Sequence, residues 1–460
     1  MKTKIYSLLL LLLGLLPESI FAQVTYFNST DAEGTVWKCR VINATTATIE
    51  DVDAAASPMF SIVGGNTKNY NGDVLHIPST VSDGTNTYTV TGFSQSYHLY
   101  AEKLVIPATV VETGNLHHIT PRRIVLETGS QMTRLGRFAY VNSGEWYDYR
   151  TPLYCDFTAA TITDADMYGF YHAADNELFF LNAASINPVK ALSYFVNSRE
   201  TINSNDNWIH GGVCDQLTVA DGEDFESPYS FTATKADYKR TFDNVAGKAV
   251  STLYLPYPTD LPNGMRAYTL IRKGFDENGD KAFCFAPVPA GTRLEAYKPY
   301  LVQITDGASH TLPTMHNVTV PATPDIESTA VMASADSDWK FYGTTLRIKN
   351  DKAYAKKAYY LNGNKWWAVQ NGVTNDYIAP FRCFISSPTG AVPAKSFLMV
   401  LDEEDNNTTG IKSLENKTNE DIKSGKYPFY SVDGKLMGND YNALESGQIY
   451  IVNGKKFYKI

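Results

Sequence analysis

Three acidic side chains lie close together in the sequence, at Asp221, Glu223 and Asp224. Glycosidases use two carboxyl groups that stand about 5–10 Å apart on either side of the scissile bond. Spacing along a chain does not set a distance in space, and acidic loops are common in an acidic chain. We therefore interpret these residues as an acidic loop, with a glycosidase pair as the alternative.

A thiol and a pair of histidines are weaker candidates for chemistry. Cys155 stands in a short apolar run with no identifiable base beside it, so we predict a core thiol instead of a nucleophile. His117 and His118, with His98 nearby, lack carboxylates or cysteines at the spacings that zinc sites use. We predict a solvated loop there, with no metal site, and no motif in the chain predicts a cofactor.

Residues 276–280 read DENGD, a run of oxygen-bearing side chains that is similar to the start of a calcium loop. Such a loop needs glycine at its sixth position and a bidentate glutamate at its twelfth. Here Gly279 is fourth and Pro287 is twelfth. The segment therefore predicts a hairpin turn.

Aromatic residues are better candidates for a binding role. Trp366 and Trp367 are adjacent, so on a strand their side chains would point to opposite faces, one into the core and one outward. A second aromatic group stands among ionic residues and comprises Trp146, Tyr147 and Tyr149. Flat aromatic faces beside hydrogen-bonding groups suit sugar rings and protein partners alike. We predict that these five residues bind a ligand, with ordinary core packing as the alternative.

The sequence has 460 residues and a formal net charge of −9. Two lysines precede a 12-residue apolar run at residues 5–16, and Ala22 offers a cleavage position, so residues 1–22 predict a signal peptide. The apolar run is too short to span a bilayer, and no later segment predicts a transmembrane span. Removing residues 1–22 takes away two lysines and one glutamate, which makes the charge −10. An acidic exported chain argues against nucleic-acid binding.

The cysteines are few and scattered, with no C-x-x-C pair. This spacing predicts neither a zinc framework nor a disulfide-dense scaffold. One or two disulfides, or buried thiols throughout, both fit the five positions Cys39, Cys155, Cys214, Cys284 and Cys383.

Two phrases of the chain nearly repeat, VLHIPSTV at residues 74–81 and KLVIPATV at residues 103–110, and a weaker third copy occupies residues 123–130. Their starting points are 29 and 20 residues apart. The first two are short apolar strands stopped by proline. Recurrence at this period predicts stacked coils that present a surface.

The 30 tyrosines, 22 phenylalanines and frequent Asn-Gly or Asp-Gly pairs predict a mostly β chain. We predict a short, degenerate leucine-rich-repeat-like β region at residues 23–205 and an antiparallel β-sandwich at residues 206–402. Residues 403–426 are polar and acidic and predict a linker, and residues 427–460 predict a small C-terminal β unit. Strands are expected at residues 36–41, 46–49, 216–219, 229–233, 251–255, 300–304, 358–361 and 396–401.

Residues 104–107 (LVIP) and 88–92 (YTVTG), together with the Phe138-Ala139 pair, resemble the BspA-like leucine-rich repeats of bacterial cell surfaces. That family has the pair in the order Ala-Phe, and most of its cysteine and asparagine positions are absent here. The resemblance implies a display surface on an exported protein.

Residues 212–219, 252–257 and 295–301 resemble a region common in exported proteins of the Bacteroidales. Residues 447–452 (GQIYIV), followed by lysines, are similar to the short C-terminal sorting modules of type IX secretion. These resemblances imply an exported protein whose last unit serves sorting or anchoring, and they imply no established chemistry.

Together these features predict a secreted or cell-surface protein that is not an enzyme and that adheres to a host protein or a glycan. An enzyme of polysaccharide degradation, or an accessory carbohydrate-binding module, is the alternative. A structural matrix protein is a further alternative. No cofactor, metal, nucleic acid or transmembrane span is predicted.

Overall fold

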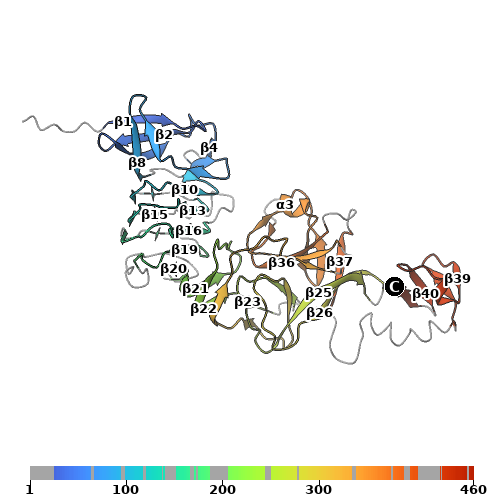
Figure 1. Cartoon of the computed structure of the whole chain (residues 1–460). Helices are drawn as coiled ribbons and strands as arrows, with labels where there is room; N and C mark the ends of the chain where they lie inside the picture. Colours follow the sequence, from blue (N-terminus) through green and yellow to red (C-terminus); the bar gives the residue numbers. More distant parts are fainter. Residues whose placement is uncertain are drawn as a thin grey trace, which may run out of the picture.

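Nearly every element of the chain is a β-strand, which confirms the predicted mostly β fold. The predicted signal peptide lies outside the described residues. The strands build a stack of coils, a curled sheet and a small C-terminal sheet (Figure 1). The computed structural model describes residues 25–63, 67–94, 99–114, 116–117, 121–136, 138–139, 152–165, 170–171, 175–186, 206–243, 250–276, 279–333, 338–373, 377–387, 394–401, 425, 427–452 and 455–459.

In the stack, three successive coils each pass through three sheets. The strands are β10 (Leu104–Ile106), β11 (Glu112–Thr113) and β12 (Leu116–His117), then β13 (Arg123–Leu126), β14 (Arg134–Leu135) and β15 (Phe138–Ala139), then β16 (Tyr154–Asp156), β17 (Asp164–Ala165) and β18 (Phe170–Tyr171). The repeated phrases supply β6 (Leu75–His76) and β10, which pair in parallel. β10 pairs in parallel with β13, so the predicted stacking of the phrases is confirmed.

One residue from each coil enters a buried ladder, because alternate side chains of a strand point to the same side. The ladder continues through β19 (Leu178–Leu181) and β20 (Trp208–His210). Its members are Leu75, Leu104, Ile124, Cys155, Phe179 and Trp208. The rings of Phe179 and Trp208 stack with centroids 4.5 Å apart. The core of the stack thus changes from aliphatic to aromatic along its length.

The N-terminal end of the stack is closed by antiparallel strands. The neighbouring pairs join β1 (Tyr26–Thr30), β2 (Val36–Val41) and β3 (Thr46–Val52). β3 then pairs in parallel with β8 (Thr87–Phe93), which also pairs with β7 (Thr80–Ser82) and with β11 of the first three-sheet coil. A three-stranded sheet of β4 (Phe60–Val63), β5 (Thr67–Tyr70) and β9 (Leu99–Tyr100) is joined to β3 by Lys68, whose Nζ donates to Asp51 at 2.5 Å.

The sheet that contains β10 continues beyond the stack. β20 pairs with the antiparallel β21 (Val213–Ala220), β21 with the parallel β22 (Phe231–Lys239), and β29 (Met315–Val320) forms the edge. β19 and β20 pair with each other although the sequence predicts a domain boundary between them, at residues 205 and 206. The division into domains stays a prediction. On the outer face, Phe180 of the stack packs edge-on against Phe231, so the stack and the following strands share a core.

The region predicted as an antiparallel sandwich contains one sheet of ten strands. All neighbouring strands are antiparallel except β26 and β37. The sheet curls on itself, since the backbone N of Cys383 donates to Thr252 Oγ1 on the first strand at 3.0 Å. The order is β24 (Val250–Leu253), β27 (Tyr300–Ile304), β25 (Met265–Phe275), β26 (Lys281–Pro287), β37 (Ser396–Leu401), β34 (Lys365–Ala368), β33 (Tyr359–Asn362), β36 (Arg382–Ser386), β31 (Lys340–Thr344) and β30 (Val331–Met332).

Short elements cover this sheet. β23 (Thr241–Phe242) pairs with β28 (His310–Thr311), and β32 (Ile348–Lys349) pairs with β35 (Tyr377–Ile378). The short helix α3 (Asn350–Ala355) follows β32 and lies above β36 and β37 in Figure 1. Among the residues that the structure describes, no helix has the length and apolar character needed to cross a membrane.

The C-terminal unit is a four-stranded antiparallel sheet with the order β39 (Leu436–Gly438), β38 (Phe429–Ser431), β40 (Ile449–Val452) and β41 (Lys455–Tyr458). These strands are the two predicted hairpins. A 3-10 helix, η1 (Tyr441–Ala443), lies between them, and Lys459 Nζ donates to the backbone O of Tyr441 and Leu444 at 2.6 and 2.7 Å. Its role in sorting or anchoring stays a prediction.

Candidate functional site

The first of the three predicted carboxylates joins two sheets. Asp221 follows β21 and accepts two hydrogen bonds from Arg382 of β36, at 2.6 and 2.7 Å, and one from the hydroxyl of Tyr238. Burial raises the pKa of Asp221, but the hydrogen bonds from Arg382 outweigh it, so the pKa lies below its usual value. Asp221 is therefore the ionised partner of an arginine.

The other two carboxylates lie in the loop after β21. Asp224 is buried and accepts hydrogen bonds from Arg122 of the stack at 2.7 Å and from the backbone N of Arg347 at 2.6 Å. Burial raises the pKa of Asp224. Burial also raises the pKa of Glu223, although the positive charge of Arg347 lowers it in part. The acidic loop thus holds the stack against the strands that follow it.

Cys155 is the core thiol that the sequence predicts, and its Sγ donates to Glu177 Oε1 at 3.4 Å. All five cysteines lie in described residues, and each is buried and free of a disulfide. Burial raises the pKa of Cys39, Cys214 and Cys383 to about 12. A thiol with such a pKa stays protonated near neutral pH, so none of these three is an activated nucleophile.

The predicted hairpin turn at residues 276–280 is confirmed. The backbone N of Asp276 donates to the O of Asp280 at 2.8 Å, and the N of Gly279 donates to the O of Asp276 at 3.1 Å, between β25 and β26. His98 and His118 lie outside the described residues. Among those that the structure describes, no group of three or more His, Cys, Asp or Glu could hold a metal ion.

β34 separates the two adjacent tryptophans in the way that the sequence predicts. Trp366 is fully buried inside the curled sheet. Its ring stacks on Phe285 with centroids 6.0 Å apart and meets Phe341 edge-on at 5.9 Å. Trp366 is therefore a core residue.

Trp367 lies on the outer face of the same strand and is partly exposed. Its Nε1 donates to the backbone O of Asn362 at 3.2 Å, a bond that fixes the orientation of the indole. The strand register places Tyr360 opposite Trp367 on one side and Ser396 on the other. An indole, a phenol and a hydroxyl thus lie on neighbouring strands of one sheet.

The helix α3 lies over the same outer face. Tyr342 and Phe384, which continue the row from Tyr360, stack with ring centroids 5.0 Å apart, and Ala353 of α3 packs in the same apolar cluster. The side-chain nitrogen of Asn350 donates to the backbone O of Gln370 at 3.0 Å. We call the outer surface of Tyr360, Trp367, Gln370 and Ser396, with the adjoining α3, the Trp367 face.

The second predicted aromatic group lies outside the described residues. It comprises Trp146, Tyr147 and Tyr149. Of the five predicted binding residues, the structure therefore places one in the core and one at the surface, and the binding role of the group stays a prediction.

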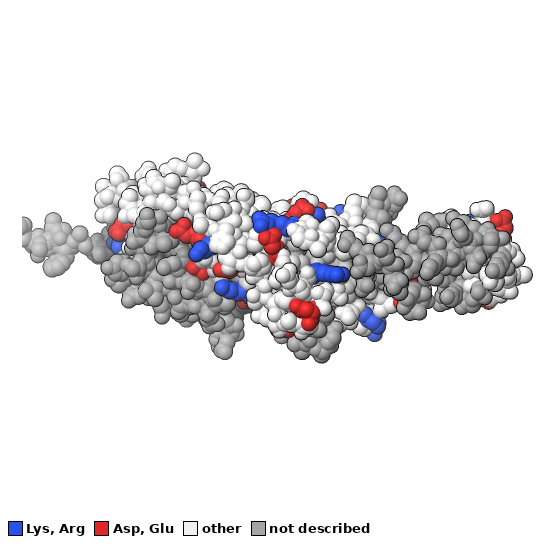
Figure 2. Space-filling view, turned by 90° about the horizontal axis from the view of Figure 1, so that it is seen from below, with Lys and Arg blue, Asp and Glu red and all other residues white. Residues whose placement is uncertain are grey.

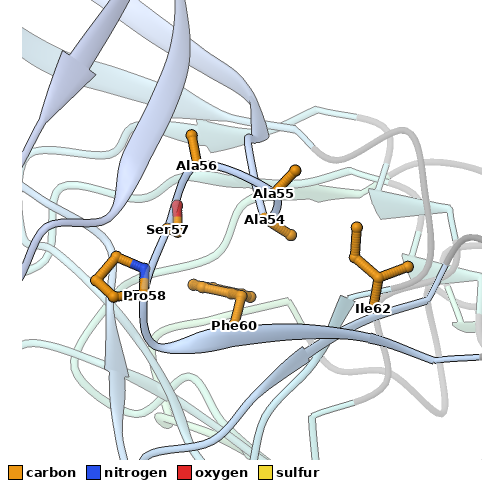
Figure 3. A pocket seen from close by; sticks show the side chains of 7 residues that line it. All are labelled: Ala54, Ala55, Ala56, Ser57, Pro58, Phe60 and Ile62. Atoms are coloured by element: carbon orange, nitrogen blue, oxygen red, sulfur yellow. The ribbon is translucent and has the colours of Figure 1, made fainter.

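Sequence reasoning missed a shallow depression of about 520 Å³ near the N-terminal end of the stack. Phe60 and Ile62 of β4 face the loop of residues 54–58 across it (Figure 3). The run of three alanines followed by Ser57 is the sequence signal, because small side chains leave the space. The lining offers contact area and no charged group. It consists of Ala54, Ala55, Ala56, Ser57, Pro58, Phe60 and Ile62.

No family model and no curated protein matches the chain. Two solved structures are similar to part of it. The pneumococcal vaccine antigen PcpA is 13% identical with a TM-score of 0.26, over 49% of this chain and 51% of that one. A leucine-rich cell surface protein from Faecalibacterium prausnitzii is 15% identical with a TM-score of 0.22, over 58% of this chain and 66% of that one. The chain spans less than two thirds of either structure, and likenesses at these TM-scores carry no argument about its function.

Proposed function

We propose that this chain is an exported, non-catalytic binding protein, secreted or held at the outer cell surface, and that the Trp367 face takes a sugar ring of a glycan. The observation that carries the proposal is the position of Trp367. Packing accounts for the buried Trp366, whereas Trp367 keeps part of its indole at the surface and is oriented by its bond to Asn362. An oriented indole beside hydroxyl groups supplies the apolar face and polar edge that sugar rings need.

The carboxylates support binding over polysaccharide degradation. A glycosidase needs two carboxyl groups that face a substrate across a cleft. Asp221 is bonded to Arg382 and Asp224 to Arg122. These carboxylates therefore hold strands together, and an accessory carbohydrate-binding role is compatible with that arrangement.

Export rests on the sequence of residues 1–22, with their lysines, apolar run and cleavage position. In the proposal, the C-terminal unit at residues 427–460 sorts or anchors the protein, and the stack and the curled sheet extend from it. The Trp367 face would then be presented to glycans outside the cell.

A glycan array probed with the chain lacking residues 1–22 tests the proposal. Trp367→Ala is the informative variant, and Tyr26→Ala is its control because Tyr26 is an exposed aromatic residue, 66% accessible, on β1 at the N-terminal end of the stack. We expect the unmodified chain and Tyr26→Ala to bind the same glycans and Trp367→Ala to lose them.

Binding that survives in Trp367→Ala, or no binding to any glycan, would contradict the proposed site. Binding to proteins on a parallel host-protein array would instead favour protein adhesion. Self-assembly without any ligand would favour a structural matrix role.

A further inference from the structure

The segment that builds the Trp367 face is positively charged in an acidic chain. Residues 349–370 contain five lysines and one acidic residue, Asp351, whereas the whole chain has a formal net charge of −9. On the side seen from below, the described Lys and Arg residues lie among Asp, Glu and uncharged residues (Figure 2). The charge of this segment is therefore local.

One lysine lies on the same strand face as the indole, and a second lies on the adjoining helix α3. Lys365 stands two residues before Trp367 on β34, so both side chains leave the same face of the strand. Lys352 belongs to α3, whose first turn is bonded through Asn350 to Gln370, three residues after Trp367. Both ammonium groups belong to exposed residues.

Glu327, an acidic residue that contacts this segment, already has several partners. The carboxylate of Glu327 accepts a hydrogen bond from Tyr342 at 3.0 Å. It also lies 3.4 Å from the Nζ of Lys340 and 3.7 Å from the Nζ of Lys356. One carboxylate thus serves two ammonium groups and a phenol, and the surface keeps its excess of positive charge.

We propose that the ligand of the Trp367 face is an anionic polysaccharide, one whose sugars carry carboxylate groups. This inference rests on the proposed function and names the ligand class of the same site. The indole packs against a sugar ring, while Lys352 and Lys365 pair with carboxylates of that ring and its neighbours. Exposed ion pairs are individually weak and are screened by salt. A polymer with a carboxylate on every sugar offers such pairs repeatedly along the face.

Polygalacturonate and its fully methyl-esterified form are the probes, because they share a backbone and differ in charge. The chain lacking residues 1–22 is titrated with each polymer by calorimetry at low and high salt. We expect polygalacturonate to bind roughly tenfold more tightly than the ester, with an affinity that falls as salt is added. Equal affinity for the two polymers would overturn the anionic class and leave sugar binding at Trp367 standing.

Paired variants locate the charge effect. Lys352→Gln with Lys365→Gln should weaken polygalacturonate binding roughly fivefold and leave binding to the ester unchanged. The control pair is Lys235→Gln with Lys239→Gln, two exposed lysines of β22 in the other large sheet, and should change neither affinity.

The failures are distinguishable. A control pair that weakens binding as much as the first pair, or a first pair without effect, would overturn the anionic ligand at this face. Binding of both polymers that persists in Trp367→Ala would overturn the proposed function as well. A chain that binds neither polymer would overturn the anionic class, and the array would still decide the proposed function.

Discussion

The stack and the curled sheet bury their side chains in two different ways. In the stack, each coil adds one residue to a ladder, so that Cys155 lies between Ile124 and Phe179 of the adjoining coils. In the curled sheet, rings from strands distant in the sequence meet, and Phe285 packs on Trp366 across the core. The core of the stack is thus built from successive coils, and the core of the curled sheet is built from strands that are distant in the sequence.

The same difference appears at the surface. In the stack, a row of charged residues alternates in sign from coil to coil and comprises Glu112, Arg134 and Asp164. The Nε of Arg134 lies 3.0 Å from Oδ2 of Asp164, and its Nη1 lies 3.8 Å from Oε2 of Glu112. In this row the single arginine is paired with a carboxylate on each side. The Trp367 face occurs once and keeps an excess of one charge, which is why we place the binding site on the curled sheet and treat the stack as its support.

The largest expected effect tests whether the buried aromatic rings around Trp366 stabilise the curled sheet. Trp366→Ala should lower the free energy of unfolding by about 3–5 kcal/mol, because it leaves a cavity among Phe283, Phe285 and Phe341. Its matched control is the adjacent Trp367→Ala, which should change that free energy by about 1 kcal/mol or less. Urea denaturation of both variants makes the measurement. Equal losses for the two would contradict the assignment of one tryptophan to the core and the other to the surface.

The second effect concerns the ion pairs that join the two regions. Asp221→Asn should cost about 3 kcal/mol near neutral pH, because Arg382 loses its charged partner in a mostly buried site. The folded pKa of Asp221 is lowered, so its contribution is present above the usual pKa and is lost as the pH falls through the lowered value. The difference between this variant and the unmodified chain should therefore shrink in acid.

Asp224→Asn is the control for the sign of that dependence. Burial raises the pKa of Asp224, so the contribution of this carboxyl is present at low pH and declines as the pH rises through the raised value. Urea denaturation at acid and neutral pH compares the two variants. Differences from the unmodified chain that move in the same direction with pH would refute the two opposite environments.

The strands were predictable because their signals are local. Alternation and turn residues located the strands at residues 300–304 and 396–401, which coincide with β27 and β37, and the repeated phrases located the first coils. Pairing is not local. The sequence does not show that Asp221 meets Arg382, 161 residues later, or that the sheet of the stack continues through β21 and β22.

The candidate site, too, was predictable only where its signals are local. Alternation implied that one of two adjacent tryptophans is buried, but the choice depends on the register that sets Trp366 opposite Leu361 and Phe397. The lysines could be counted in the sequence. The place of Lys352 at the Trp367 face depends on α3 folding over the outer face of the sheet, which side-chain packing decides.

The smallest expected effect compares how the two regions use a glycine for close approach. A Cβ at Gly136 in the stack would lie 2.0 Å from the backbone O of Thr113. A Cβ at Gly343 in the curled sheet would lie 1.8 Å from the ring of Tyr254. Each glycine-to-alanine change should cost about 2 kcal/mol by overpacking, measured by urea denaturation.

The two costs should respond differently to removal of the neighbouring side chain. In a Tyr254→Ala background the obstacle to Gly343→Ala is gone, so that change should cost clearly less than in the unmodified chain. In a Thr113→Ala background the backbone oxygen remains, so Gly136→Ala should stay as costly as before. The two double-mutant cycles would thus give a coupling energy of about 1 kcal/mol or more in the curled sheet and close to zero in the stack. Coupling of equal size in both cycles would mean that side chains, and not the spacing of the coils, limit the approach in the stack.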